Sequence, residues 1–126
     1  IKCFIDLGLT PVFCSITHDG NGQLFNTNAD TIASEIAISM TNHYDVELIY
    51  CSNKKGVLQN PKDDDSLFHC ITTKKYLELL ENQIITDGML PKLKNCFNAL
   101  NNKVGKVSIT NYQGLKYNNK VTKIML

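Results

Sequence analysis

The chain has 126 residues and a mass of 14.1 kDa, enough for one domain with a real hydrophobic core. Apolar residues make up 43% and charged residues 20%, as in ordinary globular proteins. The net charge of +1 gives no electrostatic reason to expect nucleic acid or a membrane surface as a partner, and no apolar run could span a bilayer. We expect one domain over residues 1–126, with a processed, truncated or incomplete start because residue 1 is Ile.

The five cysteines have no spacing typical of a zinc or thioredoxin-like site, and an odd number cannot all pair within the chain. Two of them, Cys14 and Cys51, follow apolar residues directly. Free cysteine behaves as a small apolar side chain, so we predict buried thiols in a reducing cytosol.

The first quarter of the chain predicts short elements. Residues 1–7 read as the end of a helix that Gly8 stops, and residues 11–17 read as a strand. Two glycines within residues 18–22 predict a turn, after which residues 23–25 could return as a short strand.

From Asn28 to about Asn42, apolar side chains recur at helical spacing. They form one apolar face: Ile32, Ala33, Ile36, Ala37 and Met40. Residues 46–51 then read as a buried strand. Residues 52–66 read as a polar loop, with short hairpin pieces around 57–58 and 67–68.

The second half continues the alternation of helices and strands. Residues 72–82 predict a helix with a threonine cap, and residues 87–102 predict a longer one. Residues 106–110 and 121–126 read as strands. This order is typical of an α/β domain with a largely parallel sheet.

Ligands of such folds bind beyond the carboxyl ends of the strands, where loops lead into helices. Asn26-Thr27-Asn28-Ala29-Asp30 lies at one such place, and its plainest interpretation is a helix cap. Asn28 would then accept hydrogen bonds from helix N–H groups, and Asp30 would complement the macrodipole.

Two further segments occupy similar positions. The turn at 52–58 contains Lys54 and Lys55, which could favour a polyphosphate or point into water. Residues 84–86 are followed by Asp87-Gly88-Met89-Leu90-Pro91-Lys92 at the start of the long helix. A helix N-terminus attracts phosphate, Gly88 would allow close backbone approach, and Lys92 would project near the phosphates.

The strings Asn26 to Asp30 and Gly88-Met89-Leu90-Pro91-Lys92 resemble the nucleotide-binding half of the amino acid kinase family, most closely the N-acetylglutamate kinases. The resemblance runs from about Leu7 to the end of the chain. It implies an α/β three-layer sandwich with a mainly parallel sheet. His18-Asp19-Gly20 and Tyr44-Asp45-Val46 are similar to the Bacteroidetes-type branch, whose members can take an N-succinyl substrate.

The resemblance also implies roles for individual residues. Lys92 and Asp30 would be catalytic: Lys92 would stabilise charge on the β–γ bridge side of the nucleotide, and Asp30 would orient the cationic groups around the transferred phosphoryl group. Asn26 would hydrogen-bond the acylamino acid. The nucleotide-binding residues would be Asn53, Lys54, Lys55, Gly56, Val57, Leu58, Ile84, Ile85 and Thr86. Asn53 stands where the family usually has aspartate, so its own role is open.

The implied reaction transfers the γ-phosphoryl group of ATP to the side-chain carboxylate of an N-acylated glutamate, in arginine biosynthesis in the cytoplasm. Mg²⁺ would be held mainly by the nucleotide's own oxygens. We assign no protein metal ligands: Asp63-Asp64-Asp65 reads as a solvated loop, and the three histidines are scattered. The family can form homo-oligomers through its other half.

In the family, a Gly-Gly turn, an arginine and a second catalytic lysine belong to an N-terminal half, and this chain has no Gly-Gly pair. We therefore expect the nucleotide half without the acceptor-binding half, and little or no kinase activity from the chain alone. Three hypotheses remain: part of an acylglutamate kinase, a related kinase with another acceptor, or a non-enzymatic nucleotide-binding module.

Overall fold

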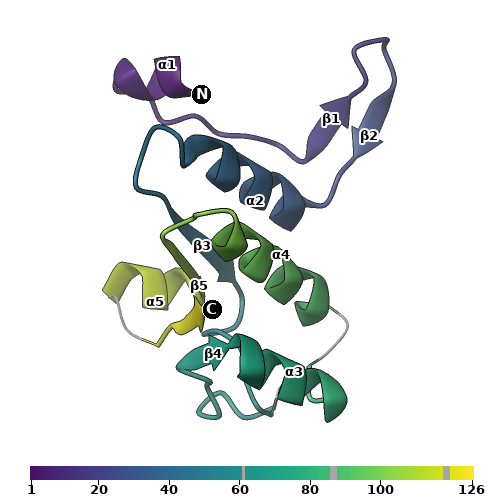
Figure 1. Cartoon of the computed structure of the whole chain (residues 1–126), viewed down its shortest axis with the longest axis vertical. Helices are drawn as coiled ribbons and strands as arrows, with labels where there is room; N and C mark the ends of the chain where they lie inside the picture. The colour runs from purple at the N-terminus through teal and green to yellow at the C-terminus, as the bar shows by residue number, and fades with distance from the viewer. Residues whose placement is uncertain (61, 86–87, 118–119) are drawn as a thin grey trace.

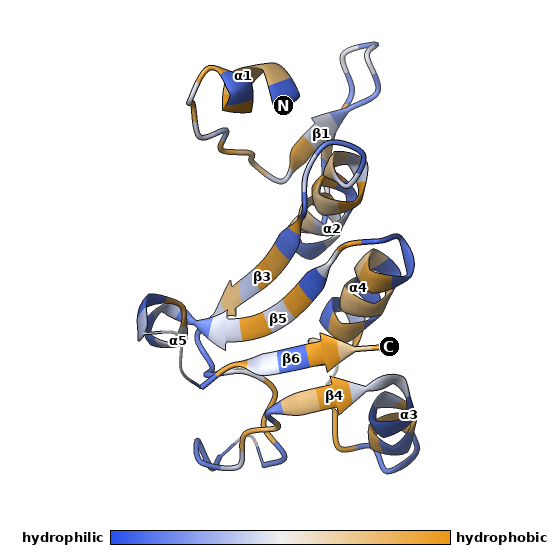
Figure 2. Ribbon diagram, turned by 60° about the vertical axis from the view of Figure 1, so that its left-hand side comes forward, coloured by the Kyte–Doolittle hydropathy of each residue, from blue (hydrophilic) through white to orange (hydrophobic). Residues whose placement is uncertain are grey.

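The computed structural model describes residues 1–60, 62–85, 88–117 and 120–126. Its centre is a four-stranded sheet. The strands are ordered β3 (Glu47–Ser52), β5 (Lys106–Asn111), β6 (Thr122–Met125) and β4 (Cys70–Thr72). β3 runs parallel to β5 and β4 parallel to β6, whereas β5 and β6 are antiparallel (Figure 2). The predicted α/β class with a mainly parallel sheet is confirmed.

Helices flank both faces of this sheet. On one face lie α2 (Ala29–Met40), α4 (Met89–Asn101) and α3 (Thr73–Glu81), and α2 and α4 run side by side (Figure 1). The short α5 (Tyr112–Tyr117) contacts β5 and β3, and it borders the other, more exposed face of the sheet beside Ile49 and Lys123. These are the three layers that the family resemblance implied.

The hydrophobic core fills the space between the sheet and α4. Alternate residues of β3 and β5 point into it, among them Leu48, Tyr50 and Ile109. Helix α4 contributes the fully buried Leu93 and Cys96. Every second residue of a strand and every third or fourth residue of a helix point to one face. These apolar faces of the sheet and of α4 pack against each other and exclude water from the space between them.

The N-terminal segment lies beside α2, outside the four-stranded sheet (Figure 1). It holds α1 (Lys2–Asp6) and a hairpin of β1 (Ile16–His18) and β2 (Leu24–Asn26). The strand predicted over residues 11–17 is wrong for residues 11–15. An apolar run becomes a strand only where a partner strand meets it, and β2 reaches only as far as Ile16.

Two elements were missed by the sequence analysis. β4 is three residues long and buries only Ile71, so it leaves no alternating pattern to detect. α5 begins where the Asn111 side chain accepts a hydrogen bond from the backbone N–H of Gly114, at 2.8 Å. The other predicted helices and strands exist, with ends that differ from the prediction by a few residues. The short hairpin predicted around residues 57–58 and 67–68 consists of a single antiparallel bridge between Leu58 and Leu67.

The cysteine prediction is largely wrong. All five cysteines are free, but only Cys96 is buried. Cys51 illustrates the reason: alternate side chains of β3 point to opposite faces of the sheet, and Cys51, like Ile49, is on the exposed face. The strand predicted as buried is therefore buried on one face only. Within the part of the chain that the structure describes, no helix has the length and apolar character needed to cross a membrane.

The loop after β3 is fastened to β6 at a point of close backbone approach. The backbone N–H of Val57 donates to Oγ1 of the buried Thr122 at 2.9 Å. A Cβ atom on Gly56 would overlap that same Oγ1 and lie 2.7 Å from Cδ1 of Leu67. Only glycine leaves room for this contact.

We therefore predict that Gly56→Ala lowers the free energy of unfolding by about 1–3 kcal/mol, because the added methyl group overpacks the loop against β6. Urea denaturation followed by circular dichroism measures this. Gly88→Ala is the matched control, since its Cβ would meet nothing within 4 Å. Equal stability of the two variants would contradict the close approach.

Candidate functional site

The first turns of α2 and α4 form the centre of the candidate site. Helix α2 begins at Asn28, whose Oδ1 accepts hydrogen bonds from the backbone N–H groups of Asp30 (2.9 Å) and Thr31 (3.1 Å). The predicted cap is confirmed. Helix α4 begins after Gly88, and no side chain of the described residues caps it.

Lys92 and Asp30 form an ion pair that joins these two turns. The Lys92 Nζ lies 2.5 Å from Asp30 Oδ1, although the residues are 62 positions apart in the sequence. Both side chains are largely shielded from solvent, with exposed fractions of 15% for Lys92 and 27% for Asp30. The two residues that the resemblance singled out as catalytic are thus in direct contact.

Tyr50 contacts both members of this pair, and the sequence analysis did not identify it. Lys92 Nζ lies over the Tyr50 ring, 4.7 Å from its centroid. The Tyr50 hydroxyl donates to the backbone oxygen of Asp30 at 2.9 Å. Burial raises the pKa of Tyr50 well above its usual value, so the phenol stays neutral. The signal was a tyrosine at a position of the predicted strand that alternates with Leu48, because the hydroxyl of a buried tyrosine needs a partner.

A second set of contacts fixes α2 against α4. The Asn95 amide donates to Oγ1 of Thr31, and the Ser34 hydroxyl donates to the backbone oxygen of Asn95, both at 3.3 Å. Ser34 is fully buried, although the sequence pattern placed only apolar residues on the packed side of α2. These bonds join the two helices on the C-terminal side of the ion pair.

A cavity of about 140 Å³ lies beside the loop after β3. It is lined by Lys54, Gly56, Val57, Leu58, Ile84, Ile85 and Met89. Complete small-molecule sites usually measure roughly 300–1,000 Å³, so this cavity could hold only part of a ligand. Six residues that the resemblance assigned to the nucleotide line it, and Met89 is an addition.

The remaining predicted residues lie elsewhere or outside the description. Asn53 is exposed in the bend after β3, and Asn26 is exposed at the end of β2. Lys55 contacts Asp65 (3.7 Å) rather than the cavity. Thr86, like its neighbour Asp87, lies outside the described residues.

The predicted solvated loop at Asp63-Asp64-Asp65 is exposed, as expected. It faces the basic turn, because Lys54 Nζ lies 3.6 Å from Asp64. Exposed pairs of this kind contribute about 0–1 kcal/mol. Among the described residues, no three His, Cys, Asp or Glu side chains gather as a set of metal ligands.

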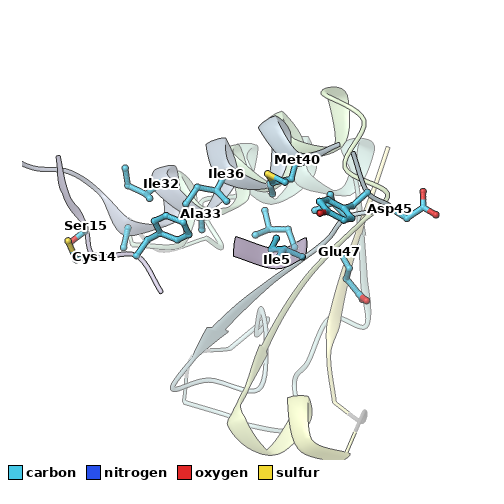
Figure 3. Close-up of a pocket in the computed structure, with 15 residues that line it drawn as sticks. Ile5, Cys14, Ser15, Ile32, Ala33, Ile36, Met40, Asp45 and Glu47 are labelled. Atoms are coloured by element: carbon cyan, nitrogen blue, oxygen red, sulfur yellow. The ribbon is translucent and has the colours of Figure 1, made fainter. Parts of the chain in front are cut away.

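A larger cavity, of about 560 Å³, opens on the far side of α2 (Figure 3). Ile32, Ile36 and Met40 of α2 line one wall, and Ile5 lies across from them. The carboxylate of Glu47 points away from it. The lining is mostly apolar and its charged residues, Asp45 and Glu47, are acidic, so this groove offers no positive charge to a phosphate.

Residues 1–111 match the sequence model of the amino acid kinase family. The chain belongs to the amino acid kinase family. The resemblance carried by Asn26 to Asp30 and Gly88 to Lys92 is thereby confirmed at the level of the family.

Relatives with curated names point in the same direction. The chain is 46% identical over 110 residues to the acetylglutamate kinase of Phocaeicola vulgatus, covering 87% of the chain and 43% of that protein. It is 44% identical over 123 residues to the acetylglutamate kinase of Azobacteroides pseudotrichonymphae, covering 98% and 48%. The chain thus spans less than half the length of these relatives.

Solved structures share the fold. The structure of smu.665 from Streptococcus mutans matches with a TM-score of 0.74 and 29% identity, over 86% of this chain and 42% of that one. N-acetylglutamate synthase from Neisseria gonorrhoeae matches with a TM-score of 0.80 over 98% of this chain and 29% of that one. At 20% identity, the second likeness concerns the fold alone.

Beneath the ion pair, burial raises the pKa of the Cys96 thiol from 9.0 to about 12. The native state therefore keeps a proton that the unfolded chain loses above pH 9. Stability from this group is complete below pH 9 and is lost as the pH rises toward 12.

We predict that Cys96→Ala flattens the decline of the melting temperature between pH 9 and pH 11, even if it lowers stability at neutral pH. Thermal melts across that range measure the slope. The control is Cys51→Ala, which removes an exposed thiol and should leave the slope unchanged. An unchanged slope in Cys96→Ala would contradict the raised pKa.

Proposed function

We propose that this chain forms the nucleotide half of an enzyme that transfers the γ-phosphoryl group of ATP to the side-chain carboxylate of N-acetyl-L-glutamate or N-succinyl-L-glutamate. The observation that carries the proposal is the ion pair of Lys92 and Asp30 at two adjacent helix N-termini. Membership of the amino acid kinase family and relatives named acetylglutamate kinase support it.

Lys92 occupies an electrostatically unfavourable place for a structural residue. It lies in the first turn of α4, where the helix dipole is positive and a cation costs about 0.3–1 kcal/mol. Asp30 offsets this cost within the folded chain. A positive charge added to a positive helix end is well suited to an anionic ligand, and local conflicts of this kind are expected at functional sites.

The adenine ring would occupy the apolar cavity lined by Val57, Leu58 and Ile85, with Lys54 at its edge. Met89, which also lines the cavity, is the first residue of α4. The helix that bounds the base site therefore also presents its N-terminus and Lys92. A nucleotide lying along this path would bring its phosphates to the cation.

In the proposed reaction, a carboxylate oxygen of the acceptor forms a bond to the γ-phosphorus, the bond from that phosphorus to the β–γ bridging oxygen breaks, and ADP leaves. Lys92 would stabilise negative charge on the phosphoryl oxygens, and Asp30 would hold Lys92 in place. Mg²⁺ would supply further charge neutralisation, bound chiefly by the nucleotide's own oxygens.

Asn26 would bind the acylamino acid from one side, and residues outside these 126 would complete the acceptor site, since the relatives are more than twice as long. We further propose that the reaction belongs to arginine biosynthesis and takes place in the cytoplasm. Oligomerisation through that other part is also proposed.

A panel of acceptors tests the proposed reaction. We expect ADP release by the full-length protein to depend on N-acetyl-L-glutamate or N-succinyl-L-glutamate, and the better of the two identifies the acyl group. Aspartate, unacylated glutamate and carbamate serve as comparison acceptors. ATP binding without ADP release for any of them would favour a non-enzymatic nucleotide-binding module instead.

Lys92→Ala in the full-length protein should lower kcat at least about a hundredfold, because a cation facing developing charge stabilises a transition state by roughly 2.7–4 kcal/mol. Steady-state ADP release measures it. Lys94→Ala is the control, since Lys94 is an exposed residue of the same helix. A fall of only a few-fold in a folded variant would remove Lys92 from the mechanism.

A further inference from the structure

Tyr50 has no role in the reaction as proposed, yet it touches both residues of the ion pair. Its ring lies under the Lys92 ammonium and its hydroxyl reaches the Asp30 backbone. It is 4% exposed and lies in the middle of β3, opposite Ile109 of β5 in the parallel register. The sheet therefore fixes the place of Tyr50, and Tyr50 in turn contacts both residues of the ion pair.

We propose that Tyr50 is a positioning residue that fixes the Lys92 ammonium for phosphoryl transfer. The ring face restricts where the ammonium can lie, and the hydroxyl secures the turn that carries Asp30. The proposal rests on the proposed function of Lys92 and goes beyond it, because it assigns the geometry of the site to a residue of the strand.

The physical reason is the freedom of the lysine side chain. Its ammonium sits on a flexible four-carbon stem and carries three donors, so one carboxylate fixes it in one direction only. An aromatic face attracts a cation from a second direction, and more strongly where solvent is excluded. Lys92 is mostly shielded here, which makes the ring contact effective. Groups held by a rigid strand position a site more exactly than groups on loops.

Two substitutions separate the two contacts of Tyr50. Tyr50→Phe keeps the ring under Lys92 and removes only the hydroxyl bond to Asp30. Tyr50→Leu keeps an apolar side chain but removes both contacts. We expect kcat of the full-length protein to stay within about threefold for Phe and to fall about tenfold for Leu, from the strength of a shielded cation–π contact.

The KM for ATP should change less than about twofold in both variants, because Tyr50 does not line the cavity proposed for the base. Tyr76→Leu is the matched control. Tyr76 is a partly buried tyrosine that packs on Phe97, with ring centroids 4.9 Å apart, so its loss should lower stability and leave kcat per folded molecule unchanged.

A double-mutant cycle asks whether Tyr50 acts through Lys92. In the Lys92→Ala background, Tyr50→Leu should cause no further loss of kcat, because the group that it positions is gone. An equal loss in both backgrounds would overturn the proposal and leave Tyr50 as a packing residue. So would a kcat of Tyr50→Leu that matches the unsubstituted protein.

A spectroscopic measurement separates this proposal from the proposed function. With ¹³C-labelled lysine, the ε-methylene protons of Lys92 should resonate upfield because the Tyr50 ring lies beneath them. The shift should persist in Tyr50→Phe and vanish in Tyr50→Leu. Its absence in the unsubstituted protein would overturn the positioning. Its presence, with kcat unaffected by Lys92→Ala, would instead overturn the catalytic role of Lys92 and leave Tyr50 as the residue that holds it.

Discussion

The ion pair between Lys92 and Asp30 ties together the first turns of two helices that arise far apart in the chain. Each charge is mostly removed from water, so neither would be tolerated there without the other. Only the carboxylate complements a helix dipole, that of α2, and it offsets the unfavourable position of the ammonium at the N-terminus of α4. The pairing therefore depends on the register of α2 against α4, which the buried Ser34 and its bond to Asn95 help to set.

In the same arrangement, an apolar cavity and an ion pair lie at neighbouring places along helix α4. Helix α4 borders the small cavity through Met89 and carries the cation one turn further on at Lys92. The loop after β3 closes the cavity from the other side, and Gly56 lets it approach β6 closely enough for the bond from Val57 to Thr122. An apolar cavity and a shielded cation on one helix are consistent with the nucleotide site proposed above. The apolar groove beyond α2 has an apolar wall but no cation in its lining, so it lacks the ionic part of this arrangement.

Much of the local structure was predictable from the sequence, because it depends on neighbouring residues. Helix α2 was marked by the cap at Asn28, and α3 by the cap at Thr72, whose hydroxyl accepts from the backbone N–H of Lys75. Strand β3 was marked by its apolar run. The family resemblance then singled out Asp30 and Lys92, which meet in the structure.

What the sequence by itself determined is this set of capped helices and apolar strands, since capping and periodicity act within a few residues. The tertiary structure alone decided that Tyr50 lies beneath Lys92 and that Ser34 faces α4. It also decided that Asp64 faces the basic turn and that Cys51 points to the exposed face of the sheet. Each of these depends on which distant segments pack together, and that follows from burying the sheet and helices against one another rather than from any local pattern.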